Sequence, residues 1–549
     1  MMSFDTKTLY QLNASRNYET WTQIIDPNLQ DEDGRDQVYY TKIGGENTPL
    51  SMSSGSTFES FSNFQFMVNY NRLFSGKHQV TGLLMAQQEQ RIRPGDRLPF
   101  NLRGVSSRVT YGYHNLYFAE FNAGYNGSEQ FAKGKRYGFF PSVSASWVAS
   151  NEAFMQDISF MDLLKFRGSY GQVGNDRLGS KRFLYLDDIQ RVGGGYSPSL
   201  GVGATISESY IGNPDIKWEI ADKFNIGLEI GLLQQFNLTV DVFKEKRSNV
   251  LISRGMVPML TGIVGDVRPP VNIGIVENKG YEIELKYNKQ FANSLSLFSN
   301  INFNRAKNKV VFMDEPILSE DYAYRYRQTG YSIGQHFGYI VDGYFNSPEE
   351  ISSYMPYEIG RSPRPGDFKY RDVNGDGKIN DRDMAPIGHS VIPEYTYGAA
   401  FGVSYKGFSI SALFQGVANV STYLSDIGVY ETYDFRERML HAWTPERYAA
   451  GEEILYPALS TGLSSSNNNN SFYLENTSFV RLKNAEVGYE FSTANWMSFL
   501  KAQSFRVYVN GMNLFTWDKM RTKDYDPEIS NSFTYPVYRV FNAGVNIIF

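Results

Sequence analysis

Cysteine is absent from this 549-residue chain. Its absence excludes a disulfide scaffold, a thiolate zinc site and a cysteine nucleophile. The formal net charge is only −5, and no block of lysine and arginine could follow a phosphate backbone, so we expect no nucleic-acid partner. The opening residues, MMSFD, form neither a basic nor an apolar segment. A secretory signal peptide is therefore expected to be missing.

Long hydrophobic runs are absent as well. No stretch reaches the roughly 18 apolar residues that a transmembrane helix needs, and the mean hydropathy is −0.39. Both facts are compatible with a transmembrane β-barrel, because barrel strands alternate lipid-facing apolar residues with lumen-facing polar ones. Aromatic residues and glycine, in contrast, are abundant, with 39 Tyr, 39 Phe and 49 Gly. This composition favours strands and turns over helices.

Apolar and polar residues alternate with a period of two along many segments, which is the pattern of a strand with one apolar face. Residues 236–242 interleave Phe, Leu, Val and Val with Asn, Thr and Asp, and residues 223–230 repeat this pattern across a short connection. The two segments predict a hairpin with one lipid-like face. Similar strands are expected at 5–14, 58–74, 77–91, 105–113, 116–127, 137–149, 163–173, 281–288, 295–303, 401–405, 410–414, 477–491, 502–516 and 537–549.

The connections between these strands differ in length in a regular way. Tight turns are expected at 75–77, 234–235, 293–294 and 406–407, and long irregular segments at 26–56, 174–216, 253–271, 313–391 and 416–476. Short turns on one rim and long loops on the other are typical of an outer-membrane barrel. The low-complexity tract Ser464 to Asn470 is expected to be a mobile loop tip. The sequence therefore predicts an all-β, antiparallel transmembrane barrel with long extracellular loops.

Six sequence blocks, spread in order over most of the chain, suggest a known family. They are FFPSVSASWVASNEAF (139–154), LLKFRGSYGQVGND (163–176), KWEIADKFNIGLEIGLL (217–233), NIGIVENKGYEIEL (272–285), PGDFKYRDVNGDGKINDRD (365–383) and FVRLKNAEVGYEF (479–491). In these blocks the chain resembles the SusC/RagA family of TonB-dependent outer-membrane transporters.

The resemblance implies a barrel of about 22 strands, of which the alternation identifies roughly 14 to 16. Residues 1–549 are thus interpreted as the C-terminal barrel part, with the signal peptide, extra N-terminal domain, TonB box and plug expected to be absent. The implied function is import of an oligosaccharide or peptide across the outer membrane of a Gram-negative, Bacteroidetes-like cell. The implied partners are a SusD-like surface lipoprotein, outer-membrane lipid and TonB–ExbB–ExbD, the last acting through the missing N-terminal region.

The segment DVNGDGKINDRD has the spacing of an EF-hand-like calcium loop. Carboxylate and amide oxygens recur at alternate positions, and a glycine stands where the loop turns sharply. An Asx/Gly turn closed by its own hydrogen bonds is the alternative interpretation. We expect a structural Ca²⁺ ion, and no other cofactor, held by side chains and one carbonyl group. The predicted ligands are Asp372, Asn374, Asp376, Lys378 through its carbonyl, and Asp383.

Three other features of the sequence have a conceivable functional meaning. GYSIG at 330–334 matches a nucleophile elbow with Ser332 as nucleophile, but no helix pattern follows it, so we interpret the match as accidental. The aromatic residues Tyr322, Tyr324, Tyr326 and Trp443 could stack on sugars or pack within their own loop, and they stay unassigned. The C-terminal Phe549 shares the apolar parity of the last strand and is predicted to be read by the barrel assembly machinery.

The leading hypothesis is therefore a component of a SusC-like nutrient importer, with substrate-binding residues unknown. No enzymatic activity is expected, because a carbohydrate-active enzyme needs a paired-carboxylate cleft that the sequence does not identify. A secreted all-β binding protein and a truncated, inactive barrel fragment are the alternatives.

Overall fold

The computed structural model describes residues 2–30, 36–94, 98–179, 181–195, 203–256, 267–323, 327–424, 437–459, 463–491, 502–529 and 537–549. The chain divides into two compact units. Unit 1 comprises Met1–Val68, Leu83–Ser106 and Tyr125–Glu129, and unit 2 comprises Asn69–Gly82, Ser107–Gly124 and Gln130–Phe549.

Sixteen strands form one antiparallel sheet, and their order across the sheet follows their order along the chain. This up-and-down meander confirms the expected all-β architecture and lies within the predicted strand number. Each strand overlaps a segment that the alternation predicts. The strands are β1 (Met2–Ser15), β4 (Ser51–Phe74), β5 (His78–Ile92), β6 (Phe100–Tyr113), β7 (Tyr117–Ser128), β8 (Tyr137–Val148), β9 (Met161–Asn175), β12 (Glu219–Leu232), β13 (Phe236–Ser253), β14 (Pro270–Gln290), β15 (Leu295–Phe312), β20 (Tyr395–Tyr405), β21 (Phe408–Ala418), β24 (Phe479–Phe491), β25 (Ser504–Asp518) and β26 (Val540–Ile548).

Unit 1 contains a long strand pair and a separate hairpin. Strand β1 pairs with β4 over its whole length, from Met2 opposite Phe64 to Ser15 opposite Ser51. The hairpin consists of β2 (Thr20–Gln30) and β3 (Asp36–Gly44). The segment 26–56 is therefore not irregular throughout, as the sequence had predicted. The prediction failed because the short strands of this hairpin carry little of the apolar alternation that marks the longer strands.

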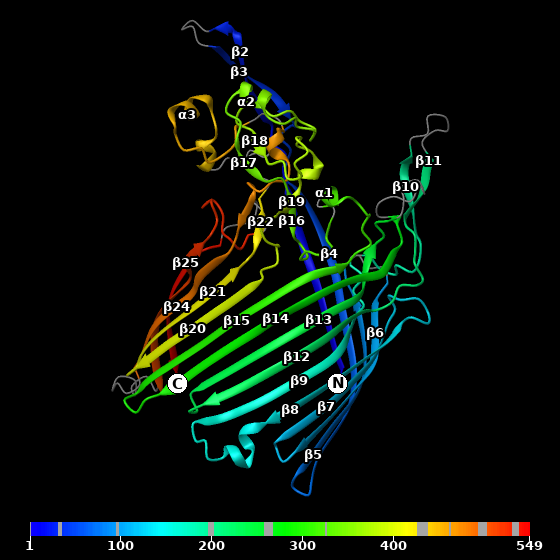
Figure 1. Cartoon of the computed structure of the whole chain (residues 1–549), viewed down its shortest axis with the longest axis vertical. Coiled ribbons are helices and arrows are strands. Elements are labelled where there is room, and N and C mark those ends of the chain that lie inside the picture. Colours follow the sequence, from blue (N-terminus) through cyan, green and yellow to red (C-terminus); the bar gives the residue numbers. More distant parts are fainter. Residues whose placement is uncertain are drawn as a thin grey trace. The chain divides into compact units, whose positions relative to one another are not determined.

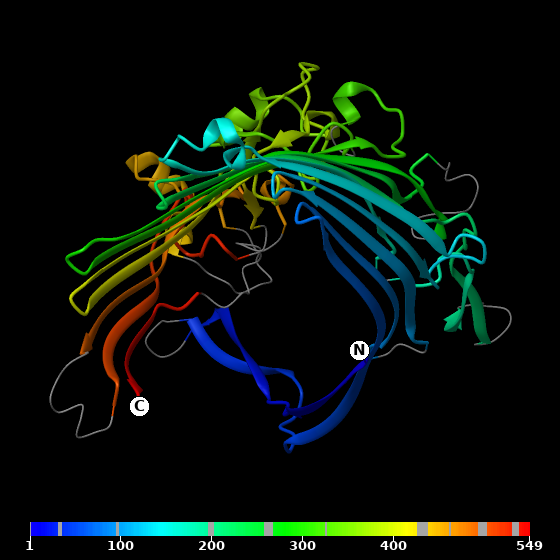
Figure 2. The same ribbon diagram turned by 90° about the horizontal axis from the view of Figure 1, so that it is seen from below.

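In unit 2 the strand register collects the apolar residues on one face of the sheet. Val240 on β13 is opposite Leu228 on β12 and Ile283 on β14, and Ile283 is opposite Phe303 on β15. The residues that precede or follow them lie opposite one another on the other face, and they are Glu229, Thr239, Glu284 and Asn302. The predicted two-faced strands therefore add up to a two-faced wall. Seen from below, these strands follow one another along a curve (Figure 2).

Aromatic rings mark both ends of the apolar band. Phe236 and Tyr287 have ring centroids 4.5 Å apart at one end, and Tyr281 and Phe303 lie 6.1 Å apart towards the other. Tyr281 and Tyr287 are six residues apart on β14, which is about 20 Å along a strand. Paired aromatic levels at this spacing are typical of a barrel wall that crosses a membrane.

The tight turns occur where the sequence predicts them. Leu233 and Gln234 both have positive φ, at 55° and 54°, and so do Lys406 and Gly407, at 46° and 91°. Two consecutive residues with positive φ are characteristic of type I′ turns, whose twist matches that of the strands they join. At Gly407 an added Cβ would lie 2.5 Å from the carbonyl oxygen of Glu490, so this turn also requires glycine for space.

Three of the long connections expected to be irregular in unit 2 contain regular elements, whereas most of the fourth, 253–271, lies outside the described residues. One of them forms the hairpin β10–β11 (Asp188–Gly195 and Gly203–Tyr210). Those after β15 and β21 form short elements at one end of the long strands (Figure 1). They are α1 (Glu320–Ala323), β16 (His336–Gly338), β17 (Val341–Tyr344), α2 (Pro348–Ser353), β18 (Phe368–Tyr370), β19 (Ala385–Ile387), β22 (Ser421–Tyr423), α3 (Pro445–Ala450) and β23 (Leu474–Asn476). Among the described residues, no helix has both the length and the apolar character needed to cross a membrane.

We use the name loop module for the described residues of 313–394, 419–478 and 519–529. The module has a core of its own, because residues from all three segments are buried together. They are Tyr339, Phe368, Tyr370, Ile379, Met384, Leu424, Met439, Ala442, Tyr456, Tyr473 and Met520. Three connections that are distant in sequence therefore fold into one body.

Candidate functional site

The polar face of the unit 2 wall carries an ionic network centred on Arg167 of β9. Its Nε lies 2.9 Å from Glu229 Oε1, and its Nη2 lies 2.6 Å from Asp241 Oδ2. The Lys165 amino group adds a contact of 3.3 Å to Glu229. Gly227 is opposite both Arg167 and Asp241, and an added Cβ there would lie 2.6 Å from the guanidinium carbon. Glycine on the middle strand thus gives the guanidinium space to reach across three strands.

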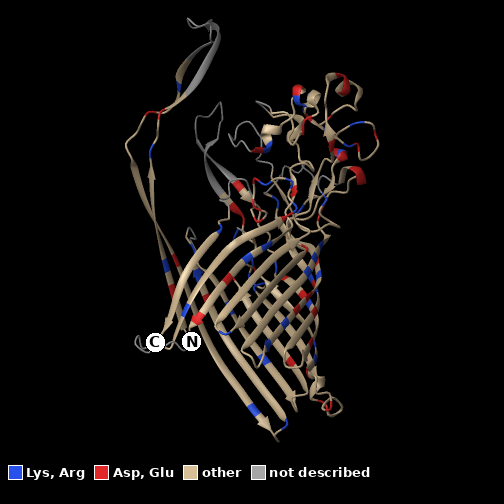
Figure 3. Ribbon diagram, turned by 90° about the vertical axis from the view of Figure 1, so that its left-hand side faces the viewer, with Lys and Arg blue, Asp and Glu red and all other residues tan. Residues whose placement is uncertain are grey.

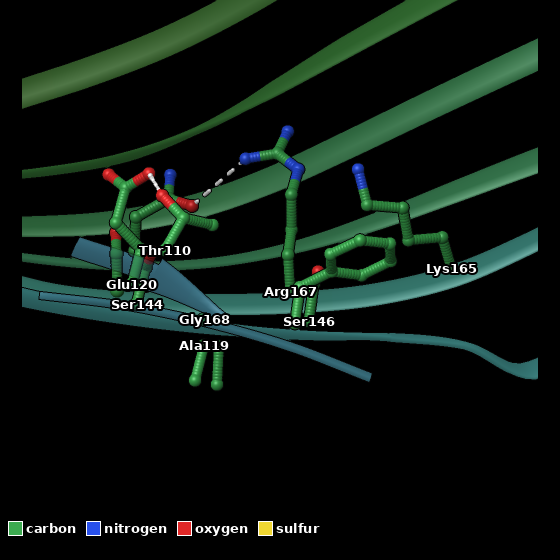
Figure 4. Close-up of a pocket in the computed structure, with 12 residues that line it drawn as sticks. Thr110, Ala119, Glu120, Ser144, Ser146, Lys165, Arg167 and Gly168 are labelled. Atoms are coloured by element: carbon green, nitrogen blue, oxygen red, sulfur yellow. Dashed lines mark hydrogen bonds between the residues drawn. The ribbon is translucent and has the colours of Figure 1, made fainter. Parts of the chain in front are cut away.

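A cavity of about 390 Å³ lies beside this network. Arg167, Lys165 and Ser146 line one side of it, and Glu120 and Thr110 line the other (Figure 4). Glu120 accepts hydrogen bonds from the Thr110 hydroxyl, at 2.9 Å, and from the Asn122 amide, at 2.7 Å. Positive and negative side chains are interspersed along the strands (Figure 3). The face therefore offers many polar contacts without a predominantly positive or negative electrostatic potential. Such a surface suits a polar solute that slides past it.

The tract Ser464 to Asn470 packs into the loop module, where its three serines and Asn470 are buried and Asn469 is exposed, so the prediction of a mobile loop tip is wrong. Asn470 is fully buried. Its amide nitrogen donates to the Tyr370 hydroxyl (3.3 Å) and to the carbonyl oxygens of Ser466 (3.0 Å) and Asn468 (2.7 Å), while its oxygen accepts from the backbone of Phe472 (2.9 Å). Serine and asparagine have short polar side chains that can form hydrogen bonds with buried backbone groups. Composition alone does not reveal this role.

Arg481 on β24 fixes the segment 519–529 to the wall. This side chain is 1% exposed. Its Nη2 lies 2.7 Å from Asp526 Oδ1, its Nη1 bonds to Glu528, and its Nε lies 2.8 Å from the Thr516 hydroxyl. A buried guanidinium with every nitrogen paired is a specific anchor. Arg481 was not among the residues predicted from the sequence; its only signal there is that it occupies a polar-face position on an otherwise apolar strand.

The five predicted calcium ligands lie in one loop of the module, in which Asp376 and Lys378 are exposed and Asp383 is buried. The Asp372 oxygens accept from the backbone N–H of Gly375 at 2.7 Å and of Gly377 at 2.9 Å. Asp383 accepts from Val373 at 2.9 Å and from Asn380 at 2.8 Å. Among the described residues, no three His, Cys, Asp or Glu side chains converge on a metal-binding point. The predicted set also uses the Asn374 amide and the Lys378 carbonyl, and calcium binding stays a prediction.

The two end carboxylates of this loop differ electrostatically. Burial acts to raise the pKa of Asp372, but the N–H groups of Gly377 and Gly375 outweigh it and hold that pKa below its ordinary value of 3.8. Burial raises the pKa of Asp383 above 3.8 despite the N–H groups of Asn380 and Val373. Asp383 is fully buried, so its negative charge is the one that a cation would stabilise most.

The structure also shows where the other candidate residues from the sequence lie and what Ser332 and Trp443 contact. The Ser332 hydroxyl donates to the carbonyl oxygen of Asn308 at 2.9 Å, and turns follow it, so residues 330–335 lack the helix that a nucleophile elbow needs. Trp443 is buried and donates its indole N–H to Asn346 at 3.1 Å, so it packs inside the loop module against a different connection from its own. Tyr322 ends up in the short helix α1, whereas Tyr324 and Tyr326 lie outside the described residues.

Phe549 follows β26 and is 74% exposed. Phe541, Val545 and Ile547 on its parity are exposed too, and Val545 is opposite Val507 on β25. The terminal ring therefore continues the apolar face, as the sequence predicts. Its recognition by the assembly machinery stays a prediction.

A meander of long two-faced strands with a loop module at one end is the architecture of the wall of an outer-membrane-type β-barrel. The family model described as TonB dependent receptor-like, beta-barrel matches residues 2–514. The chain belongs to this family.

Several relatives support the assignment. TonB-dependent receptor P3 of Formosa agariphila is 28% identical over 82% of this chain and 45% of its own length. TonB-dependent receptor SusC of Bacteroides thetaiotaomicron is 27% identical over 80% of this chain and 43% of its own length. A solved structure of the RagAB peptide transporter matches with a TM-score of 0.71 and 20% identity, covering all of this chain and 60% of that one. The SusC/RagA resemblance is thus confirmed, and the chain spans about half the length of the relatives it matches.

Proposed function

We propose that the chain is the barrel wall of a TonB-dependent importer that carries a nutrient, either an oligosaccharide or a peptide, across an outer membrane. The observation that carries this proposal is the two-faced wall. One face presents aligned apolar side chains to lipid, and the other presents the Arg167 network to a polar solute. The relatives named SusC and RagAB support the same class of function.

The partners follow from this proposal. A SusD-like lipoprotein would cover the loop module, whose buried core gives it the rigidity of a docking platform. TonB, energised by ExbB and ExbD, would act through a region outside these residues. Barrel closure would require further strands, because an open sheet edge leaves backbone groups unpaired in hydrocarbon.

A structural calcium ion in the 372–383 loop is part of the proposal. Five oxygen-bearing groups at the required spacing support it, together with the raised pKa of the buried Asp383 carboxyl. The ion would stiffen the loop and take no part in transport chemistry.

Uptake measurements test the proposed function. We expect deletion of the gene to abolish growth of the host on one peptide or oligosaccharide mixture as sole carbon source, and collapse of the proton gradient to stop uptake in the intact strain. Growth on monosaccharides and free amino acids is the control. Unchanged uptake of every mixture, or release of the protein into the medium without detergent, would favour an inactive fragment or a secreted binding protein instead.

A further inference from the structure

The apolar face of the wall changes character near the end of the strands that carries the loop module. From Leu238 to Val242 on β13 every second residue is apolar, and the next residue of the same parity is Lys244. The same change occurs beyond Tyr281 on β14 and beyond Phe303 on β15. The basic residues past this level on the apolar face are Lys244 and Lys246 on β13, Lys279 on β14, and Arg305, Lys307 and Lys309 on β15.

Three of these lysines lie in one line across neighbouring strands. Lys244 on β13 is directly opposite Lys279 on β14, and Lys279 is directly opposite Lys307 on β15. We call these three side chains the lysine row. Residues opposite one another have Cβ atoms about 4.5 to 5.5 Å apart, and like charges in such pairs destabilise a sheet. The protein therefore holds three cations together at a cost in free energy.

The next line of residues toward the loop module alternates in charge instead. Asp222 on β12 is opposite Lys246. Glu277 on β14 is opposite both Lys246 and Lys309. Opposite charges stabilise cross-strand pairs, so this line is neutralised within the protein. The lysine row has no acidic member, and its position on β12 holds Phe224.

Carboxylates approach the lysine row without forming hydrogen bonds to it. Glu277 Oε2 lies 3.6 Å from Lys244 Nζ, and Glu394 Oε2 lies 3.7 Å from Lys307 Nζ. Both distances are longer than a hydrogen bond. The Lys244 and Lys307 side chains are 57% and 54% exposed, and Lys279 is exposed as well. The ammonium groups of the row therefore keep N–H donors for an anion from outside the protein.

Aromatic rings place the lysine row at the level of lipid headgroups. Tyr281 and Phe303 mark the end of the apolar band toward the loop module, and the Arg305 guanidinium lies 5.6 Å from the centre of the Tyr395 ring. Such aromatic levels lie at the boundary between hydrocarbon and headgroups. Lys279 is two residues beyond Tyr281, which is about 7 Å along the strand. The headgroup region on each side of a bilayer is about 5 to 8 Å thick, so the row lies within it.

We propose that the lysine row binds the phosphate group of a phosphorylated lipid in the outer leaflet, while the acyl chains of this lipid pack on Tyr281 and Phe303. Phosphate oxygens accept several charge-assisted hydrogen bonds, and lysine stems are long and flexible enough to converge on one phosphate. A bound anion also removes the repulsion between the three cations. The inference depends on the assignment of the two faces of the wall and goes beyond the import of a nutrient.

Lipid binding to the protein, purified in an uncharged detergent from the membranes of its host, tests the inference. The probes are diphosphorylated lipid A, the same lipid with its phosphates removed, and inorganic phosphate. Native mass spectrometry measures the occupancy of each. We expect the phosphorylated lipid to bind roughly 100-fold more tightly than its dephosphorylated form, and added salt to weaken its binding. Equal binding of the two lipids would overturn the inference, and so would binding of inorganic phosphate as tight as that of the phosphorylated lipid.

Two combined variants locate the site. Lys244→Gln, Lys279→Gln and Lys307→Gln together should weaken binding of the phosphorylated lipid by roughly 100-fold. This variant should unfold at a temperature no lower than the native protein in detergent without lipid, because it removes like-charge repulsion. Arginine at the same three positions keeps the charge and should keep the binding. A loss in the arginine variant as large as that in the glutamine variant would overturn the inference.

The matched control removes three cations from the opposite end of the strands. Lys77→Gln, Lys289→Gln and Lys406→Gln together change residues at or beside the tight turns, and lipid binding should stay as in the native protein. An equal loss in the control and in the glutamine variant of the row would mean that net charge, and not the lysine row, attracts the lipid, which would overturn the inference.

The outcome for the inference is separable from the outcome for the proposed function. A native protein that binds the lipid through the lysine row but imports nothing would overturn the importer function alone. Energy-dependent uptake by a protein whose lipid binding is unchanged in the glutamine variant of the row would overturn the inference alone.

Discussion

Asn470 illustrates how much of the loop module depends on single polar side chains. It contacts residues near and far in sequence, and Tyr370 is 100 positions away. Each of its hydrogen bonds replaces water that the buried position cannot admit. A module built in this way is sensitive to small changes at buried asparagine and serine, and tolerant of the same changes at its surface.

We expect Asn470→Ala to lower the free energy of local unfolding of the module by about 2 to 4 kcal/mol, because several buried groups lose their partners at once. Hydrogen exchange followed by mass spectrometry measures this effect as a rate increase of roughly 30-fold or more in peptides from 464–474. Asn469→Ala, at the exposed neighbouring position, is the matched control. Equal exchange in both variants would mean that the buried amide does not stabilise the module.

The two end carboxylates of the 372–383 loop lead to a prediction about calcium and pH. Asp372, whose pKa is lowered, contributes stability above pH 3.8 that is lost as the pH falls through its folded pKa. Asp383, whose pKa is raised, contributes stability below pH 3.8 that is lost as the pH rises through its folded pKa. Near neutral pH, Asp383 is therefore a buried charge that the N–H groups of Val373 and Asn380 compensate only in part, and Ca²⁺ should stabilise the loop there.

Titration calorimetry should show Ca²⁺ binding at pH 7 that weakens as Asp383 becomes protonated at acidic pH. Asp372→Ala should remove the binding, whereas Glu349→Gln, a change of equal charge on α2, should not. Heat signals that are identical in the native protein and Asp372→Ala would show that the loop is an Asx/Gly turn only.

At the scale of elements, Arg481 connects a strand of the wall to a segment of the module. The segment 519–529 has its own contacts with the rest of the module, since Arg521 bonds to the backbone of Leu474 at 3.2 Å and to Glu475 at 3.3 Å. Arg481 adds the contacts with the wall, and Pro527 and Ile529 of the segment line a second cavity, of about 470 Å³, at the ends of β21 and β24. The order of this segment therefore decides whether that cavity exists.

Arg481→Met should lower the free energy of local unfolding of the segment 519–529 by about 2 to 4 kcal/mol, because Asp526 and Glu528 lose their buried partner. Hydrogen exchange should rise in this segment and stay unchanged in β24. Lys523→Met removes an exposed cation of the same segment, where the amino group pairs with Asp518 at 2.8 Å, and should cost less than about 0.5 kcal/mol. A segment that stays equally protected in Arg481→Met would show that its other contacts suffice.

At the scale of the whole molecule, the two faces of the wall should differ in their tolerance of charge. Val240→Arg places a cation in the middle of the apolar face and should lower the stability of the folded barrel in a lipid bilayer by about 2 to 4 kcal/mol. Thr239→Arg, one residue away, places the same side chain on the polar face between Glu229 and Glu284, and should cost little. The amount of each variant in outer-membrane fractions measures the difference, and equal amounts would contradict the assignment of the faces.

The sequence by itself determined the strands, their faces and their tight turns, because these features are local. A period of two fixes which side chains share a face, as in 236–242, and the register then aligns these faces between neighbours. The short turns at Gln234 and Gly407 depend only on a few adjacent residues. The spacing of the predicted calcium ligands from Asp372 to Asp383 is local as well. The sequence therefore identifies the loop but does not decide whether calcium occupies it.

Only the tertiary structure decided the loop module and the two cavities. The bonds of Tyr370 to Asn470 and of Arg481 to Asp526 join segments whose separation leaves no periodic signal in the sequence. Burial of the three serines and Asn470 in SSSNNNN could not be read from composition, because polar residues are ordinarily exposed and are buried only where backbone groups need hydrogen-bond partners. The second cavity is lined by His336, Val417 and Pro527, which come from three separate segments, and only the fold brings these segments together.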